Sequence, residues 1–346
     1  MSRRAKIIAG AVVGVIVAAL GAFWLLGNKS PDELLGDITG EPTVCALTGE
    51  EPSDEALAER PAVAVKIENN PSAYPLSGLD KAEVVYEELV EGGFTRFMAL
   101  YHCTDTRTAG PVRSARAVDP EIMGAVTRIL GAAGGNSFVR DELTEADIVL
   151  IDENAAGTAM RREERPGISL EHTLYADTNK LRKLGVKEFE EAPPEKIFEF
   201  GDLPSGGKPA SSVTVNFTEG GRTVEWRFEN GRYARFDEGA ELPLESGRVL
   251  ADNVIIEIHT ISFAKGVVDV AGTSSVVIDD PTGTGKALLF RDGKVFIGTW
   301  ERDSVDVPMT FTTKSGDSMM LAKGKTWIEL IPNKQGEVKG SFSYAR

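Results

Sequence analysis

The chain of 346 residues has few of the residues that build metal and nucleophile sites, with two cysteines and three histidines. The histidines, His102, His172 and His259, show no metal-ligand spacing, so the sequence predicts no dedicated zinc site. No GxSxG motif occurs, and neither cysteine has a convincing histidine partner in the sequence. We therefore expect no metal and no cofactor.

Basic residues are also scarce, since 38 lysines and arginines face 53 acidic residues and give a net charge of −15. This balance argues against a general nucleic-acid-binding protein and against broad adhesion to anionic lipid or anionic wall polymer. A local basic site is compatible with the same composition.

Long apolar stretches are missing beyond residues 7–27, which follow the basic tip MSRRAK. About 20 apolar residues span the roughly 30 Å hydrocarbon core of a bilayer. Arg3, Arg4 and Lys6 predict a cytoplasmic N-terminus and an extracytoplasmic remainder. A cleaved signal peptide is the alternative, but no good cleavage site follows Leu26. We expect a single-pass membrane protein of undetermined oligomeric state.

The two cysteines, Cys45 and Cys103, both fall on the expected outer side of the membrane. In an oxidising compartment two such residues can pair, and closing this loop would stabilise the fold by about 4 kcal/mol in the chain-entropy model. Two buried thiols are the alternative. We expect the disulfide.

The composition along the chain predicts an α+β protein with five parts. These are a basic tip and transmembrane helix (1–27), an acidic stalk (28–60), a mixed α/β domain (61–190), a linker rich in proline and glycine (191–211), and a mostly β domain, sandwich or barrel (212–346).

Several local patterns support the mixed α/β part. The run PAVAVKIEN (61–69) predicts a buried strand, and β-branched and aromatic residues on both sides of Gly92-Gly93 predict a hairpin. A helix and turn is the alternative for the first half of that hairpin. Asp119 as N-cap and Pro120 predict a helix start, and residues 129–152 read as a βαβ-like unit.

The expected β domain contains short strand-like runs separated by turns. Trp226, Trp300 and Trp327 lie within these runs. They could form a surface that stacks on sugars, but core tryptophans are the more common case.

The stretch GPVRSARAVDP (110–120) carries Arg113 and Arg116 immediately before the predicted helix. Forked guanidinium groups next to a helix N-terminus, with Ser114, would suit a carboxylate or phosphate. Alternatively, the arginines pair with carboxylates of the chain itself, for which the candidates are Glu68, Glu83, Glu87, Glu88, Glu91 and Asp119.

Glu87 and Glu91 flank the predicted hairpin turn, and Arg96 follows it. Two carboxylates near one guanidinium could have separated pKa values, as acid–base catalysis and glycosidic cleavage require. His172 could assist. Solvated or salt-bridged carboxylates and a structural histidine are the alternative for all three.

Residues 60–103 followed by GPVRSARAVD (110–119) resemble the N-terminal part of the YerB-like family of bacterial extracytoplasmic proteins. EWRFENGRYARF, ADNVIIEI, GKVFIGTWER and GKTWIELIP resemble its C-terminal part, and the resemblance covers most of residues 43–335. It implies an extracytoplasmic location and a two-part domain of unknown function. Positions that match the fingerprint are Asn69, Gly78, Glu87, Glu91, Gly92, Thr95, Arg96, Gly110, Pro111, Arg113, Ser114, Arg116 and His172.

The chain departs from that family in two respects. Typical members are lipoproteins, whereas this chain has the apolar run 7–27. The family also has Pro-His-Asn-Leu-Tyr where this chain has Glu171-His172-Thr173-Leu174-Tyr175.

Three functions follow as hypotheses. In the first, a membrane-anchored envelope protein binds an anionic or cell-wall-derived ligand, or another envelope protein, through Asn69, Arg96, Arg113, Ser114 and Arg116. In the second, it cleaves peptidoglycan with Glu87 or Glu91 and His172. In the third, it has a structural or assembly role without catalysis.

Overall fold

The computed structural model describes residues 42–189, 191–203, 205–268 and 272–346, and these are mostly β with few helices. Val44–Arg346 forms one compact unit. The expected membrane span 7–27 lies outside the described residues. Among the residues that are described, no helix has the length and apolar character needed to cross a membrane.

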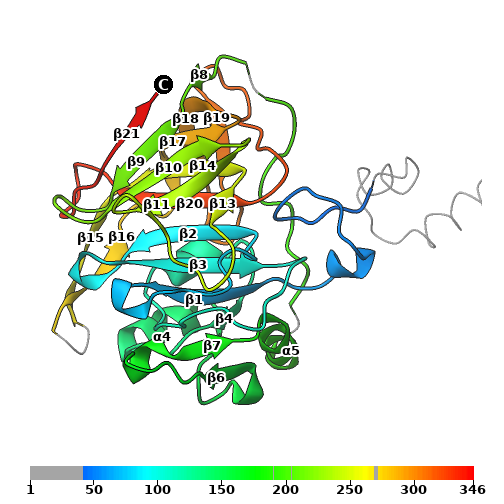
Figure 1. Cartoon of the computed structure of the whole chain (residues 1–346), viewed down its shortest axis with the longest axis vertical. Helices are drawn as coiled ribbons and strands as arrows, with labels where there is room; N and C mark the ends of the chain where they lie inside the picture. Colours follow the sequence, from blue (N-terminus) through cyan, green and yellow to red (C-terminus); the bar gives the residue numbers. More distant parts are fainter. Residues whose placement is uncertain (1–41, 190, 204, 269–271) are drawn as a thin grey trace, which may run out of the picture. The chain divides into compact units, whose positions relative to one another are not determined.

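An eleven-stranded mixed sheet runs through both halves of the chain (Figure 1). Its strands from the first half are β1 (Val63–Asn69), β2 (Val84–Leu89), β3 (Thr95–Tyr101), β4 (Ile129–Gly131) and β5 (Val149–Ile151). Those from the second half are β8 (Lys208–Pro209), β14 (Asn253–His259), β17 (Gly283–Arg291), β18 (Lys294–Arg302), β19 (Thr310–Thr313) and β20 (Thr326–Pro332). The order is β19-β18-β17-β14-β20-β2-β3-β1-β4-β5, with β8 paired to β18.

The two halves join where β2 pairs in parallel with β20. Val84 lies opposite Thr326 and Glu87 lies opposite Glu329. The expected α/β and β segments therefore share this sheet, with hydrogen bonds that cross from one segment to the other.

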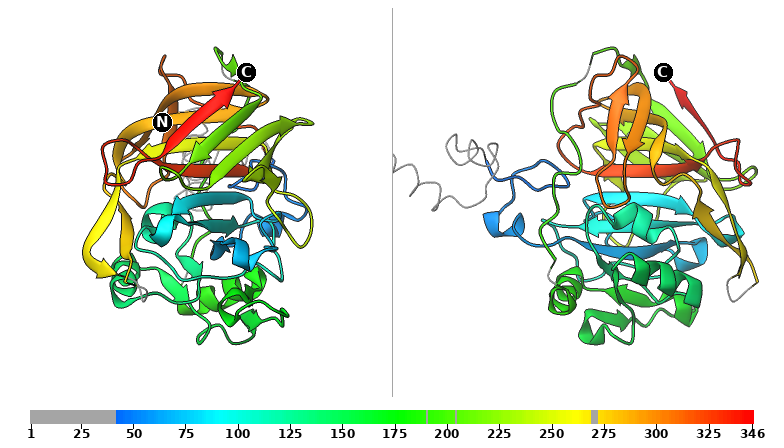
Figure 2. Two further views of the ribbon diagram at one scale, coloured as in Figure 1. Left: turned by 60° about the vertical axis from the view of Figure 1, so that its left-hand side comes forward. Right: turned by 180° about the vertical axis from the view of Figure 1, so that it is seen from behind.

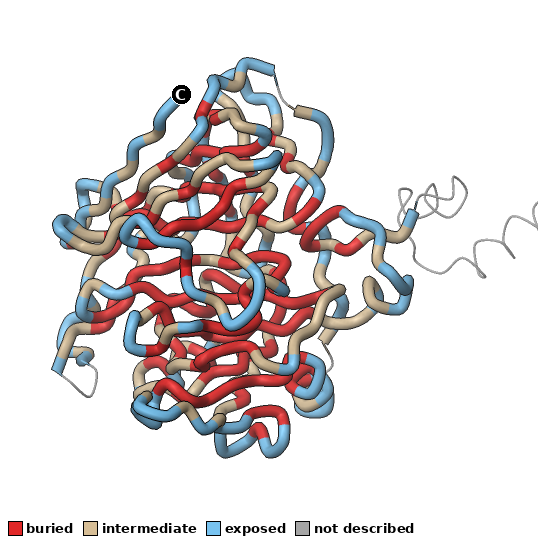
Figure 3. Tube along the Cα trace, in the orientation of Figure 1, coloured by how far each residue is buried: buried red, intermediate tan, exposed pale blue. Residues whose placement is uncertain are grey.

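A six-stranded sheet covers part of one face of the central sheet. Its strands are β9 (Ser212–Asn216), β10 (Thr223–Glu229), β11 (Arg232–Asp237), β12 (Ala240–Glu241), β13 (Leu250–Ala251) and β21 (Ser341–Ala345). Trp226 on β10 meets Trp327 on β20 edge-on, with 5.2 Å between ring centroids. Trp226 and Trp300 are completely buried and Trp327 nearly so, which confirms the core interpretation of the tryptophans. Figure 3 shows the buried strands of both sheets in red.

Helices flank the first half of the central sheet (Figure 2). Two of them, α3 (Asp119–Met123) and α4 (Ser137–Glu145), pack their apolar side chains against Ala64, Met98 and Leu130 on one face. On the other face, α5 (Thr178–Glu188) packs Leu181 against Ile129 and Ile151.

The local predictions for the first half are largely confirmed. Strand β1 forms within residues 61–69, and β2 and β3 form an antiparallel hairpin. The β4-α4-β5 segment is a βαβ unit with parallel strands. The expected N-cap was wrong, because Val118 occupies that position and Asp119 lies in the first turn of α3. The buried Asp119 carboxylate instead accepts hydrogen bonds from Lys66 Nζ at 2.5 Å and from the Arg116 amide at 2.8 Å.

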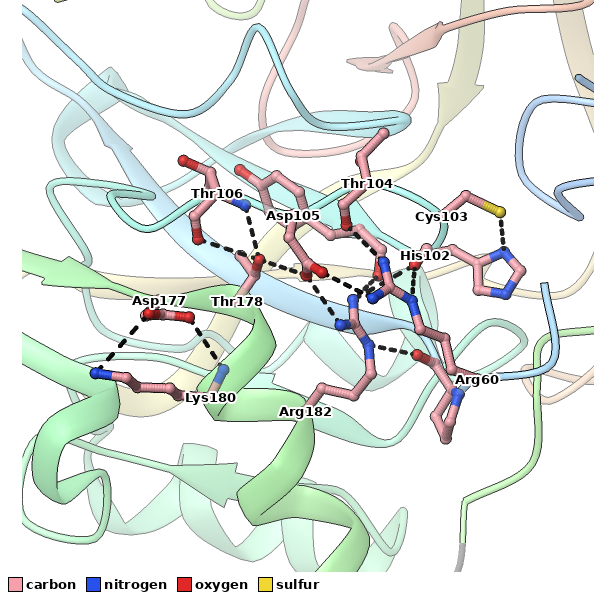
Figure 4. Close-up of polar contacts among 12 residues, drawn as sticks. Arg60, His102, Cys103, Thr104, Asp105, Thr106, Asp177, Thr178, Lys180 and Arg182 are labelled. Atoms are coloured by element: carbon pink, nitrogen blue, oxygen red, sulfur yellow. Dashed lines mark hydrogen bonds and ion pairs between the residues drawn. The ribbon is translucent and has the colours of Figure 1, made fainter. Parts of the chain in front are cut away.

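Cys45 and Cys103 form the predicted disulfide, with 6.0 Å between their Cα atoms. The loop after β3 is fixed further by the network of Figure 4, in which Arg182 of α5 binds Asp105 Oδ1 at 2.9 Å and the Pro61 carbonyl at 2.7 Å. Glu83 lies beside the two sulfur atoms, but the disulfide leaves neither of them able to bind a metal as a thiolate.

Candidate functional site

The carboxyl ends of β1 and β2 lie at one edge of the central sheet, because both strands pair antiparallel with β3 between them. In open α/β sheets, ligands bind outside such strand ends. The short turn η3 (Glu91–Gly93) leads into β3 at this edge. Gly92 and Gly93 have φ values of 71° and 75°, a region that glycine adopts without a Cβ penalty.

The segment that carries Arg113 and Arg116 runs beside β1. The Glu68 amide donates to the Pro111 carbonyl at 3.0 Å, and the Arg113 amide donates to the Lys66 carbonyl at 2.9 Å. This pairing places Arg113 next to Glu68 and carries the chain onward to Arg116, next to Glu91.

These elements enclose a pocket of about 260 Å³, which we call the arginine pocket. Arg96, Arg113 and Arg116 all line it, although they come from two separate segments. The remaining lining residues are Glu68, Asn70, Val90, Glu91, Gly92, Phe94, Thr95 and Thr273.

Each arginine is held in part by the chain itself. Arg113 Nε lies 3.2 Å from Glu68 Oε1, and Arg116 Nε donates to Glu91 Oε2 at 2.6 Å. Arg96 Nη1 donates to the Ser114 carbonyl at 2.7 Å. Arg113 and Arg116 are therefore paired with carboxylates of the chain itself, as the alternative in the sequence analysis predicted. Ser114 binds Arg96 through its main-chain oxygen.

His172 lies behind the pocket and does not line it. Its Nδ1 is 2.7 Å from Glu68 Oε2, so the two oxygens of Glu68 join His172 to Arg113. The Glu171 carbonyl also accepts a hydrogen bond from Arg113 Nη1 at 3.4 Å. His172 thus orients the partner of an arginine.

The pocket carries more positive than negative charge, since three arginines face Glu68 and Glu91. Burial of Arg96, together with the nearby charges of Arg116 and Arg113, lowers its pKa to about 9. The crowding of guanidinium groups is thus only partly compensated by the chain's own carboxylates.

Asn69 and Glu87 lie on the other face of the sheet, toward the six-stranded sheet. The fully buried Glu87 accepts hydrogen bonds from Arg235 Nη2 at 2.9 and 3.0 Å and from Thr95 Oγ1 at 2.7 Å. Asn69 Nδ2 donates to the same carboxylate at 3.1 Å. Glu87 and Glu91 are therefore neighbours in sequence that do not line a common pocket.

Glu329 completes this buried group. It lies opposite Glu87 on β20, is fully buried, and accepts a hydrogen bond from Trp226 Nε1 at 2.7 Å. Burial and the neighbouring Glu87 raise the pKa of Glu329 well above its usual range. The raised pKa favours the protonated, neutral form of Glu329.

Comparison with known proteins matches both halves of the chain to one family. Residues 47–191 match the N-terminal domain, and residues 213–328 the C-terminal domain, of the family described as protein of unknown function DUF3048. The chain is a DUF3048 protein. A relative from Bacillus subtilis (strain 168), named "Putative lipoprotein YerB", is 27% identical over 92% of this chain and 95% of its own length. The resemblance to the YerB-like family is thereby confirmed.

The same fold occurs in a solved structure. The crystal structure of the YerB protein from Bacillus subtilis matches 87% of this chain and 99% of its own, with a TM-score of 0.69 and 24% identity.

Sequence reasoning did not single out Arg235, Glu329 or Lys66, all of which are buried in this DUF3048 chain. Each is a charged residue with an apolar residue on either side, in RYARF, TWIELIP and AVAVKIEN. That pattern was a usable signal, because a buried charge requires a partner or a function.

Proposed function

We propose that this DUF3048 protein is an extracytoplasmic, membrane-attached envelope protein that binds an anionic ligand in the arginine pocket. The observation that carries the proposal is the convergence of Arg96, Arg113 and Arg116 on one pocket with two carboxylates. A cell-wall fragment that carries a carboxylate or phosphate has the required chemistry.

The location is supported by the sequence and by the disulfide. The relative from Bacillus subtilis is named a putative lipoprotein, which supports attachment to a membrane. In this chain both cysteines, Cys45 and Cys103, are engaged in one disulfide, so neither offers a thiol for lipid attachment. We propose that residues 7–27 provide the attachment instead.

The unused guanidinium donors define how the anion would be held. The Nη2 groups of Arg96, Arg113 and Arg116 make no hydrogen bond to any described residue. Two or three such groups can surround one oxyanion, with charge-assisted bonds that are stronger than neutral ones. Glu68 and Glu91 hold the arginines in place without neutralising all three.

Binding of muropeptides and of inorganic phosphate to the purified full-length chain tests the proposal. Arg113→Gln and Arg116→Gln should each weaken binding at least about tenfold, since hydrogen bonds to charged groups contribute about 1.5–3 kcal/mol. Arg161→Gln is the matched control, because it removes the same charge from an exposed ion pair with Glu163 outside the pocket. Absence of binding by the wild type, or equal binding by Arg113→Gln, would remove the proposal.

Glu87 and Glu91 do not line one pocket, so the geometry does not support them as a pair for glycosidic cleavage. Glu87 is fully buried and engaged by Arg235, while Glu91 is paired with Arg116 in a different pocket. A structural or assembly role remains the simplest alternative, and it predicts that the arginine variants lose stability without any ligand being involved.

A further inference from the structure

A second group of ionisable residues lines a small enclosed cavity at the same edge of the central sheet, beside its second half. The polar residues are Glu257 and His259 at the end of β14, Arg302 at the end of β18, Glu121 in α3 and Tyr86 on β2. The cavity measures about 30 Å³, enough for a small polar group or a water molecule.

His259 is almost completely buried and fixed on three sides. Its Nε2 lies 3.5 Å from Glu257 Oε2, and its Nδ1 lies 3.4 Å from Asp280 Oδ1. The ring stacks on Trp300 with 4.7 Å between centroids. Burial alone would lower the pKa of His259, but the bonds to Asp280 and Glu257 outweigh it and raise the pKa to about 9.

Glu121 has a polar atom without a partner. Its Oε2 is buried and makes no hydrogen bond within the described part of the chain. Burial raises the pKa of Glu121 to about 8, so the side chain is a neutral acid near pH 7 and can donate a hydrogen bond. A buried polar atom without a partner is uncommon and costly in folded proteins.

The charges around the cavity balance. His259 and Arg302 are positive, while Glu257 and the Asp280 carboxylate that bonds His259 are negative. Arg302 is already engaged, because its guanidinium group donates to the carbonyls of Glu121, Ser304, Val305 and Val307. A charged ligand group would therefore find no uncompensated partner here.

An open groove of about 550 Å³ adjoins the cavity. The two share an apolar wall made of Ile197, Phe198, Pro308, Met309 and Phe311. Ligand sites in proteins commonly combine such apolar walls with a few convergent polar groups.

We propose that the cavity and groove form a second ligand site, separate from the arginine pocket, for a neutral amphipathic molecule. Its uncharged hydroxyl or amide group enters the cavity and bonds Glu121, and its apolar body lies against Phe198 and Met309.

Four small probes in two matched pairs test the charge preference. Neutral butanol and charged butylamine share an n-butyl body, whereas neutral butyramide and charged butyrate share an n-propyl body. Each is titrated into the full-length chain in micelles while the ring resonances of the three histidines are followed. The His259 resonance should shift saturably with the neutral probes, and the charged probes should bind at least about tenfold more weakly.

Variants test the placement. Ala125 lines the cavity and is only partly buried, so Ala125→Met should fill the space and weaken butyramide binding at least about tenfold. Glu121→Gln keeps a neutral hydrogen-bonding group and should bind within about threefold of wild type, whereas Glu121→Leu should lose about five- to tenfold. Glu145→Gln, at an exposed position of α4, is the control and should change nothing.

Three results would overturn the proposal. One is butyrate or butylamine binding as tightly as butyramide, and another is the absence of any saturable His259 shift. The third is a folded Ala125→Met variant, with unchanged thermal midpoint, that binds butyramide like the wild type.

Discussion

Glu87 and Glu329 lie opposite each other on adjacent parallel strands, both completely buried, with Arg235 as the guanidinium bound to Glu87. Asp237 lies 3.7 Å from Arg235 and is also paired with Arg222, so three carboxylates meet two guanidinium groups and leave one negative charge in excess. The raised pKa of Glu329 favours its neutral form, which removes that excess between the two sheets.

The two glutamates should therefore respond differently to substitution. Glu87→Gln leaves Arg235 without its bidentate partner and should reduce the free energy of unfolding by about 3–5 kcal/mol. Glu329→Gln keeps the neutral form and the acceptor for Trp226, so it should stay within about 1 kcal/mol of wild type at mildly acidic pH. Urea unfolding measures both, and equal losses would contradict a neutral Glu329 in the folded protein.

The pH dependence of stability should separate the same variants. Because the pKa of Glu329 is raised in the folded protein, its contribution is present below its ordinary value of 4.5 and is lost as pH rises through the folded pKa. Glu329→Gln should lack this loss and gain stability relative to wild type with rising pH. The unfolding midpoints of wild type and Glu329→Gln are measured across a pH series. If the two curves run parallel, Glu329 does not have a raised pKa in the folded protein.

His102 and His259 should titrate far apart. Burial lowers the pKa of His102 to about 4, whereas Asp280 and Glu257 raise that of His259 to about 9 despite burial. His259 then stabilises the fold fully below pH 6.5 and ceases to do so as pH rises through about 9. His102 has the opposite sign, with stability lost as pH falls from 6.5 toward 4. The ring chemical shifts, followed against pH, give the pKa of each histidine. A His259 pKa below 7 would contradict its pairing with Asp280 and Glu257.

Anion binding in the arginine pocket should depend on the protonation of Arg96. Its pKa is lowered to about 9, and a bound anion would raise it again, so binding takes up a proton near that pH. Above about pH 8, where inorganic phosphate stays a dianion, its affinity should hold until about pH 9 and then fall by up to about tenfold per pH unit. Calorimetry in buffers of different ionisation enthalpy detects the proton, and affinity that increases above pH 9 would refute the role of Arg96.

The disulfide should contribute substantially to stability. It closes a loop with a sequence separation of 58, which corresponds to about 4 kcal/mol in the chain-entropy model. Reductant should lower the urea midpoint of the wild type. The Cys45→Ser/Cys103→Ser double variant should have this lower urea midpoint from the outset, and reductant should not change it. A wild type whose midpoint does not respond to reductant would contradict the prediction.

Local patterns predicted the elements that depend on neighbouring residues. The strand 63–69, the hairpin around Gly92 and Gly93, and the βαβ unit all follow from short-range periodicity and turn chemistry. The pairing of β2 with β20 does not, because those residues are separated by most of the chain and no local signal specifies their register.

The candidate site was predictable to a similar extent. Arg96, Arg113 and Arg116 were named from their spacing and residue type, and the structure places them in one pocket. Asn69 was grouped with them through the family resemblance, and Glu87 was predicted as an acid or base near Arg96. Alternation along β1 and β2 sends their side chains to the opposite face, where the partner Arg235 lies 148 residues from Glu87.

The shared central sheet limits how members of this family can exchange parts. A chimera that takes residues 47–191 from one relative and residues 213–328 from another must match β20 to a foreign β2. It must also supply Arg235 for Glu87. The junction between the two halves of this chain therefore constrains such exchange, and mismatched hybrids should lose stability at the Glu87–Arg235–Glu329 group even when each half is intact.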